Sequence, residues 1–270
     1  MEVHDNFYAR REINSWKNNS DVTSSNVLFR VAENVAKWSD QELYLNLSQP
    51  KTEDIETLDY SPLGPHTPTQ LIAPIDNARF TNSTLLQEDI LLIDFGKSFP
   101  FLTPPTGYEP ATAPKYVSLE ACFEGRIGPP ADVWALACTI FQIHAGFPLF
   151  EASLGEDGVL KKIVVTLGKL LDPWWGMFNN RHIWFDEDRN PKVLGSAKKT
   201  SIKQKLASIG SQDVPLKIGD DGPMAEWPGT RLTDVEIEVL GDLLEKMLRY
   251  QPQDRIKMCE VVAHPWFALK

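Results

Sequence analysis

Two short polar motifs follow or precede predicted strands and could together hold a metal ion. Asp21 and Asn26 form a D-x-x-x-x-N motif that leads into an apolar stretch, Val27 to Val31. Asp94 ends a second apolar stretch, Ile90 to Ile93, and opens an Asp-Phe-Gly sequence. Carboxylate and amide oxygens suit Mg²⁺, and phosphoryl transfer needs metal ions on the phosphates and a carboxylate that accepts a hydroxyl proton. Either motif alone is weak, but their order and strand context together favour this chemistry.

A buried helix is predicted between Pro130 and Gly146. Apolar residues occupy every face of this segment, which is typical of a helix in the middle of a core. Gly146 provides a stop signal. The one charged side chain, Asp132, lies in the first turn, where the helix dipole favours an anion. Because a desolvated carboxylate is costly unless it is hydrogen-bonded, we expect Asp132 to have a buried partner.

The other predicted elements are short and mostly helical. Residues 27–31 and 90–93 are expected to be strands. Capping boxes, Ser39 with Glu42 and Thr233 with Glu236, predict the starts of two helices. The pattern predicts helices over 40–47, 157–167, 234–248 and 258–263, surface loops over 49–74 and 97–115, and a basic, solvated stretch over 192–205. The sequence therefore predicts a mainly α (α+β) fold with a small β element near its N-terminal end.

Composition excludes several classes of protein. The 270 residues are 42% hydrophobic and 24% charged, with a net charge of −10, which argues against direct nucleic-acid binding and would suit a basic partner. Cys122, Cys138 and Cys259 show no C-x-x-C spacing, which favours a reducing compartment over disulfides or a zinc site. No apolar run reaches membrane length, and Met1 to Arg11 is not a secretory signal. We expect a soluble intracellular protein of the cytoplasm, the nucleus or both, without a membrane partner.

The ordered motifs resemble the C-terminal lobe of eukaryotic protein kinases. Within that superfamily they are most similar to fungal kinases related to the SR-protein (splicing-factor) kinases. The resemblance covers about Asp21 to Phe267. It rests on D-V-T-S-S-N-V-L-F, L-I-D-F-G-K-S-F-P, Glu120, A-D-V-W-A-L-A-C-T-I-F, Pro252 with Arg255, and H-P-W-F. The fold that it implies is a protein-kinase-like C-terminal helical lobe with a small β element.

The resemblance implies roles for the residues that could do chemistry. Asp21 lies where the catalytic base accepts the proton of a substrate hydroxyl. Asn26 and Asp94 lie where Mg²⁺ ligands hold the phosphates of ATP, with Gly96 completing the Asp-Phe-Gly motif. Asp132 matches the carboxylate that hydrogen-bonds the catalytic-loop backbone. The expected cofactors are therefore ATP and Mg²⁺.

The resemblance also implies a domain plan and a buried ion pair. Glu120 and Arg255 match residues that fix the end of the activation segment to the last helices, and the stretch from Val117 to Glu120 holds the substrate-facing loop. The implied plan is a non-family segment over 1–20 and a kinase C-lobe over 21–270, comprising a catalytic loop (21–26), an insertion (about 33–88), an activation segment (94–120) and a helical subdomain (130–270).

The sequence departs from the kinase pattern in several places. No glycine-rich loop, strand lysine or helix glutamate precedes residue 21, so the N-terminal lobe is expected to be absent. Asn19 and Ser20 replace the usual His and Arg, and Thr23 replaces the catalytic-loop Lys. Ser118 and Leu119 replace the first two residues of Ala-Pro-Glu.

Several functional interpretations follow. One is a serine/threonine protein kinase, presented as a C-lobe, whose acidic surface suits basic Arg/Ser-rich protein substrates. Another is a kinase-lobe remnant or scaffold without turnover, because loss of one wall of the ATP site should cost transition-state stabilisation. Such a lobe would expose apolar surface for a partner to cover. The three polar site residues could also be mere turn and cap residues, and an incomplete gene model could explain residues 1–20.

Overall fold

The computed structural model describes residues 17–18, 22–75, 83–100, 112–151, 155–192, 199–210 and 231–269. The chain divides into two compact units. The first comprises residues 1–27, 93–216 and 226–270, and the second comprises residues 28–92 and 217–225. The first unit is mainly helical, and the second contains two of the three small sheets.

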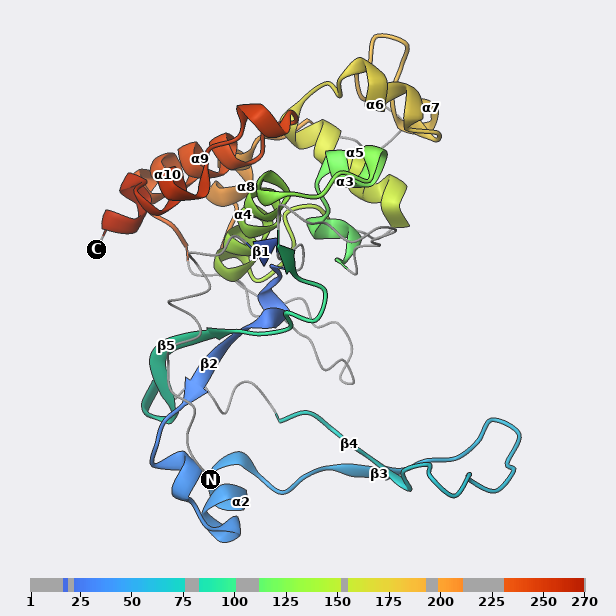
Figure 1. Ribbon diagram of the computed structural model, residues 1–270, viewed down its shortest axis with the longest axis vertical. Helices are drawn as coiled ribbons and strands as arrows, with labels where there is room; N and C mark the ends of the chain where they lie inside the picture. The colour runs from blue at the N-terminus through green and yellow to red at the C-terminus, as the bar shows by residue number, and fades with distance from the viewer. Residues whose placement is uncertain are drawn as a thin grey trace. The chain divides into compact units, whose positions relative to one another are not determined.

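The first unit is built around α4, which spans Pro129–Ala145 (Figure 1). Pro129 suits the first helical position because it needs no backbone N–H there. Gly146 ends the helix with φ of 75°, and its N–H donates to the carbonyl of Gln142 at 2.8 Å, a left-handed cap that glycine adopts without strain. Ten of the residues of α4 are buried on several faces, as predicted for a core helix.

The described part of this unit contains seven further helices and four 3-10 turns. α4 contacts α9 and the turns η1, η5 and η7. Leu, Val, Ile and aromatic side chains from these elements share one hydrophobic core. The elements are α3 (Leu119–Glu124), α5 (Gly155–Leu167), α6 (Asp172–Met177), α7 (Arg181–Trp184), α8 (Ile202–Ala207), α9 (Asp234–Met247), α10 (Met258–Val262), η1 (Ser24–Asn26), η5 (Pro114–Tyr116), η7 (Pro252–Asp254) and η8 (Pro265–Ala268).

Aromatic rings fill the space between these helices. Trp134 of α4 is fully buried and stacks on Phe150, with ring centroids 5.9 Å apart. Trp174 of α6 is 2% exposed and stacks on Phe123 of α3 at 6.0 Å. Its neighbour Trp175 is half-buried and packs against the same core. The adjacent tryptophans Trp174 and Trp175 therefore anchor one edge of the core.

A short strand pair adds to the helical unit. β1 (Lys17–Asn18) runs antiparallel to β6 (Phe99–Pro100), with Asn18 opposite Phe99. Phe99 is only 6% exposed, so the prediction of a fully exposed loop over 97–115 is wrong at its start, because this strand buries an aromatic ring. The pair also places Lys17–Asn18 in the helical unit, upstream of the boundary predicted at residue 21. Residues 101–111 of the predicted loop lie outside the described residues.

The second unit has a small core of its own. Val35, Leu47 and Leu85 form that core. β2 (Val27–Val31) pairs with β5 (Leu86–Leu92), and β3 (Thr52–Asp54) pairs antiparallel with β4 (Gln70–Ile72). The remaining elements are η2 (Val35–Lys37), α2 (Asp40–Leu47) and η4 (Ser83–Leu85).

Three local predictions need correction. The stretch 49–74 is not a plain loop, because β3 and β4 form a hairpin within it, although both strands are exposed (Figure 1). The second strand starts at Leu86 and ends at Leu92, earlier than the predicted 90–93. The basic stretch 192–205 is not wholly solvated, because α8 begins there and buries Ile202.

Both predicted capping boxes are present. Ser39 accepts from the N–H of Glu42 at 3.3 Å and opens α2, and Thr233 accepts from the N–H of Glu236 at 3.3 Å and opens α9. In each box the glutamate carboxylate also accepts from the N–H of the N-cap residue, which satisfies a second donor at the helix start.

Within the described residues, no helix combines the length and apolar character that crossing a membrane requires.

Candidate functional site

The ends of two strands bring Asn26 and Asp94 into the same neighbourhood. Asn26 closes η1 immediately before β2, and Asp94 lies two residues after β5. The N–H of Ile93 donates to the carbonyl of Asn26 at 2.9 Å. Since Asp94 follows Ile93 directly, this hydrogen bond fixes the backbone of both candidate ligands at one place.

Asp94 has an unusual backbone conformation. Its φ is 62°, in the left-handed region that non-glycine residues seldom occupy. A turn follows, in which Ser98 donates to the carbonyl of Phe95 through its N–H at 3.0 Å and through its hydroxyl at 2.7 Å. Gly96 has no such φ, and a Cβ there would lie 3.6 Å from a carboxylate oxygen of Asp94, an ordinary contact. The turn therefore depends on the conformation of Asp94 more than on the absence of a side chain at Gly96.

The segment before Asn26 is anchored on α4. The hydroxyl of Thr139 donates to the carbonyl of Val22 at 2.8 Å. Within the segment, the N–H of Asn26 donates to the carbonyl of Thr23 at 3.0 Å. Thr23 itself is 4% exposed, and its hydroxyl lies 3.2 Å from that of Ser25. The core helix thus holds the backbone that leads to Asn26.

A buried tyrosine makes a second connection between this segment and α4. The phenol oxygen of Tyr116, in η5, lies 3.2 Å from the hydroxyl of Ser24. The same phenol donates to the side-chain amide oxygen of Gln142 in α4. Tyr116 is 3% exposed, and the ammonium of Lys115 lies 5.3 Å from its ring centroid. Three segments that are distant in sequence therefore meet at one hydroxyl group.

Glu120 and Arg255 form a buried ion pair, as the resemblance implies. Arg255 donates through Nη1 and Nη2 to the two carboxylate oxygens of Glu120, each at 2.6 Å, and the side chains are 1% and 4% exposed. The guanidinium also donates to the carbonyls of Arg249, Pro130 and Tyr250 at 2.7, 2.9 and 3.1 Å. It lies 5.0 Å from the ring centroid of Trp134. The pair joins the start of α3 to the segment after α9.

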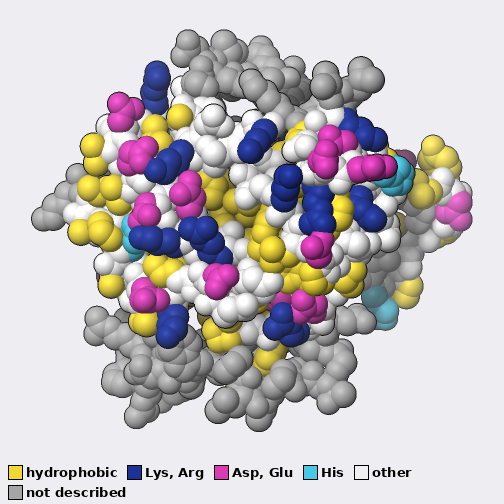
Figure 2. All heavy atoms as spheres, turned by 90° about the horizontal axis from the view of Figure 1, so that it is seen from above, with side chains coloured by type: hydrophobic (Ala, Val, Ile, Leu, Met, Phe, Trp, Pro, Cys, Tyr) yellow, Lys and Arg dark blue, Asp and Glu magenta, His cyan; other side chains and the backbone are white. Residues whose placement is uncertain are grey.

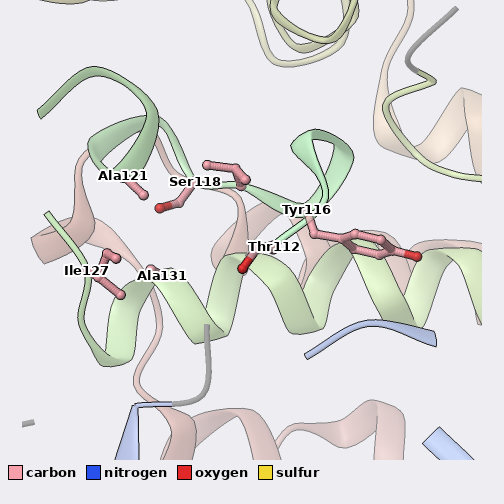
Figure 3. A pocket seen from close by; sticks show the side chains of 7 residues that line it. Thr112, Tyr116, Ser118, Ala121, Ile127 and Ala131 are labelled. Carbon is pink, nitrogen blue, oxygen red and sulfur yellow. The ribbon is translucent and has the colours of Figure 1, made fainter. Parts of the chain in front are cut away.

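A small pocket lies beside the predicted substrate-facing loop, between η5, α3 and the start of α4 (Figure 3). Its volume of about 10 Å³ matches the space that one water molecule needs. The hydroxyl of Ser118 is buried without a hydrogen-bond partner among the described residues and points toward Ala121. The pocket is lined by Thr112, Tyr116, Val117, Ser118, Ala121, Ile127 and Ala131.

The remaining predicted site residues are placed only in part. Asp21 lies outside the described residues, together with Asn19 and Ser20. Asp132 lies half-buried in the first turn of α4. Among the described residues, no group of three or more His, Cys, Asp or Glu side chains could hold a metal ion. The described candidates for Mg²⁺ are therefore one carboxylate and one amide, which fit a cation that retains several waters and binds substrate phosphates.

Sequence reasoning missed the residues that support the loop. Thr139 and Gln142 are the two polar residues that α4 buries. Since buried polar side chains need partners, their presence in an otherwise apolar helix is the signal that could have identified them. Ser24 and Tyr116 gave no comparable signal, because their contact depends on the tertiary fold.

Charges outside the site are mixed in sign. On the face shown in Figure 2, basic and acidic side chains are interspersed over the described surface. Lys205 of α8 donates to the carbonyl of Leu149 at 3.1 Å, and burial lowers its pKa to about 8. Lys203 pairs with Glu238. The expected acidic surface is therefore not a single-sign field on this face, and the basic residues of α8 have intramolecular partners.

Comparison with known proteins decides the family. The family model for the protein kinase domain matches residues 81–267, more than half of the chain. The chain belongs to the protein kinase family. The matched segment includes Asp94, Glu120, Asp132 and Arg255, whereas Asp21 and Asn26 precede it.

Curated protein kinases are similar to this kinase-family chain at low identity. Cell division control protein 2 homolog 1 of Trypanosoma brucei brucei is 22% identical over 68% of this chain and 54% of its own length. The dual specificity protein kinase CLK1 of Homo sapiens is 24% identical over 69% and 34%. The SRSF protein kinase 3 of Mus musculus is 24% identical over 56% and 24%. The chain thus spans about half or less of the length of these relatives.

Proposed function

We propose that this protein transfers the γ-phosphoryl group of ATP to serine or threonine hydroxyls of a protein substrate. The observation that supports this most is the backbone hydrogen bond between Ile93 and Asn26, which brings Asn26 near the residue before Asp94 in a chain of the protein kinase family. Phosphoryl transfer depends on positioning and charge stabilisation more than on covalent chemistry. Phosphoryl transfer requires metal ligands held at a fixed position, and the oxygen atoms of the Asn26 and Asp94 side chains are groups of that kind.

The proposed roles follow the predicted site. Asn26 and Asp94 would hold Mg²⁺, which neutralises charge on the ATP phosphates when bound. Asp21 would accept the proton of the attacking hydroxyl. Asp132 would support the backbone of the catalytic loop, residues 21–26.

We further propose that these residues correspond to the C-terminal lobe of a kinase fold. Three observations support this assignment: the central helix α4, the buried ion pair of Glu120 with Arg255, and the pairing of β1 with β6. β1 precedes Asn26 in the chain, and β6 follows Asp94. In that assignment residues 94–120 form the activation segment, Gly96 belongs to its opening turn, and residues 33–88 form an insertion. A partner chain or segment would cover the ATP from the opposite side.

The proposed substrate class is a basic protein segment, including Arg/Ser-rich sequences. The net charge of −10 favours a basic partner. One relative is named an SRSF protein kinase, which adds a reason to test such peptides first. We also propose that the protein acts in the cytoplasm, the nucleus or both, because its three cysteines favour a reducing compartment.

A binding role without turnover is the second candidate. Thr23 stands where the resemblance expects a lysine, and its side chain is buried against Ser25. It therefore supplies no positive charge to a transferred phosphate. In this alternative the lobe binds a protein partner and has no kinase activity.

Binding of a fluorescent ATP analogue to the full chain, as a function of Mg²⁺, tests the proposal. We expect saturable binding that Asp94→Ala abolishes. Asp188→Ala, which removes an exposed carboxylate far along the chain, serves as the matched control and should bind like the wild type. Phosphotransfer to an Arg-Ser peptide would then be measured. Absence of Mg²⁺-dependent binding at millimolar nucleotide would contradict the proposed kinase activity and favour the protein-binding role without turnover.

A further inference from the structure

We propose that the hydroxyl of Tyr116 is a positioning group that couples the catalytic loop to α4. This inference rests on the proposed function for its consequence in nucleotide binding, but its structural part can be tested separately. The observation behind it is the chain of hydrogen bonds from Ser24 through Tyr116 to Gln142.

The direction of the hydrogen bonds follows from the chemistry of the three groups. A phenol has one proton to donate, and here it is donated to the amide oxygen of Gln142. The oxygen of Tyr116 must then accept from the hydroxyl of Ser24, 3.2 Å away. Ser24 is therefore held by a donor–acceptor relay with a defined polarity, whose far end is fixed on the core helix.

The surroundings make this relay rigid. Tyr116 is 3% exposed and Gln142 is 8% exposed, so water competes little for either group. Hydrogen bonds at low local dielectric are stronger, and the loss of a partner leaves a buried polar group unsatisfied. The ring of Tyr116 belongs to the main core cluster, so its position does not depend on the hydroxyl alone.

The relay acts close to a proposed metal ligand. Ser24 and Asn26 belong to the same single-turn η1, and the carbonyl of Asn26 accepts from the N–H of Ile93. Thr139 holds the other end of the loop through the carbonyl of Val22. Loss of the Tyr116 hydroxyl should remove the side-chain link from Ser24 to α4 and loosen η1, which would displace Asn26 relative to Asp94.

The first test measures the structural part. Hydrogen exchange of the full chain, followed by mass spectrometry, compares Tyr116→Phe and Ser24→Ala with the wild type. Both variants should exchange faster at the amides of Asn26 and Ile93 and be unchanged in α9. Tyr250→Phe is the matched control, because it removes another phenol, a half-buried one that donates to the carbonyl of Gly168 at 2.7 Å. Unchanged exchange at Asn26 and Ile93 in both variants would overturn the proposal.

The second test measures the consequence for the metal. In Tyr116→Phe the Mg²⁺ concentration at half-maximal binding of the ATP analogue should rise about three- to tenfold, the size expected for one hydrogen bond. A shift in the same direction is expected for Ser24→Ala, and the double variant should shift no further than Tyr116→Phe, because both single changes break the same bond between Ser24 and Tyr116. Additive shifts, or an equal shift in Tyr250→Phe, would overturn it. Wild-type protein that binds no nucleotide would refute the proposed function, while the exchange experiment would still decide the relay.

Discussion

Arg255 donates hydrogen bonds to both carboxylate oxygens of Glu120 at 2.6 Å, although the two residues are 135 positions apart in the sequence. Neither side chain is more than 4% exposed. Removing two charges from water costs free energy, and their mutual attraction offsets this cost only when the ion pair is well aligned and its remaining donors are hydrogen-bonded. Here the guanidinium also satisfies three backbone carbonyls, so its donors are well used. The pair joins α3 to the end of the helical unit, which makes it a sensitive point for mutation.

Breaking this pair should be strongly destabilising. Glu120→Gln leaves the buried guanidinium without its counter-charge, and we expect a loss of about 3–5 kcal/mol in the free energy of unfolding. Denaturant unfolding followed by circular dichroism measures the loss. The control is Lys246→Ala, which removes an exposed pair with Asp242 and should cost less than about 1 kcal/mol. Equal losses in the two variants would contradict the buried character of the Glu120 pair.

The stability of the protein should fall at mildly acidic pH because of His144. Burial lowers the pKa of His144 below its ordinary value of 6.5, and its ring lies edge-on to Trp266 at 5.3 Å. In the unfolded chain this imidazole takes up its proton at higher pH, so the unfolded state binds more protons in that window. The stabilising contribution is therefore complete above pH 6.5 and is lost as the pH falls through the lowered pKa.

The His144→Phe variant tests this pH dependence. Phenylalanine keeps an aromatic contact with Trp266 but cannot be protonated. Melting temperatures between pH 5 and pH 8 should fall less steeply on acidification in the variant than in the wild type. Parallel curves for the two proteins would show that another group controls the acid response.

The three cysteines should differ sharply in reactivity. Cys138 is 2% exposed in α4, and burial raises the pKa of its thiol, so little thiolate forms in the native state. Cys122 and Cys259 are exposed, although partial burial raises the pKa of Cys122. Iodoacetamide at pH 8 should therefore modify Cys259 first, Cys122 more slowly, and Cys138 only after denaturation. Peptide mass spectrometry gives the order, and native labelling of Cys138 would be the contrary result.

The N-cap of α9 should be worth a measurable share of the stability. Thr233→Ala removes the side-chain acceptor for the N–H of Glu236, and we expect a loss of about 0.5–2 kcal/mol. Thr233→Ser keeps a hydroxyl at the same place and should remain close to the wild type. Chemical denaturation of the three proteins provides the comparison, and a Ser variant as unstable as the Ala variant would argue against capping.

The sequence by itself determined the local elements that follow short-range rules. The apolar run with Gly146 as a stop predicted α4, and the capping boxes at Ser39 and Thr233 predicted α2 and α9. These features depend on neighbours within about four residues, because helix ends are satisfied by nearby side chains. The resemblance to protein kinases also came from ordered motifs, and the family match agrees with it.

Only the tertiary structure decided the contacts between distant segments. The β3–β4 hairpin was missed because its strands are exposed and lack an apolar alternation. Phe99 was assigned to an exposed loop because nothing in its neighbours indicates the pairing with Asn18. The meeting of Ser24, Tyr116 and Gln142 has no signature at all in sequence spacing. A hydrogen bond between residues many positions apart depends on how the core packs, and packing is a property of the whole fold rather than of any one stretch.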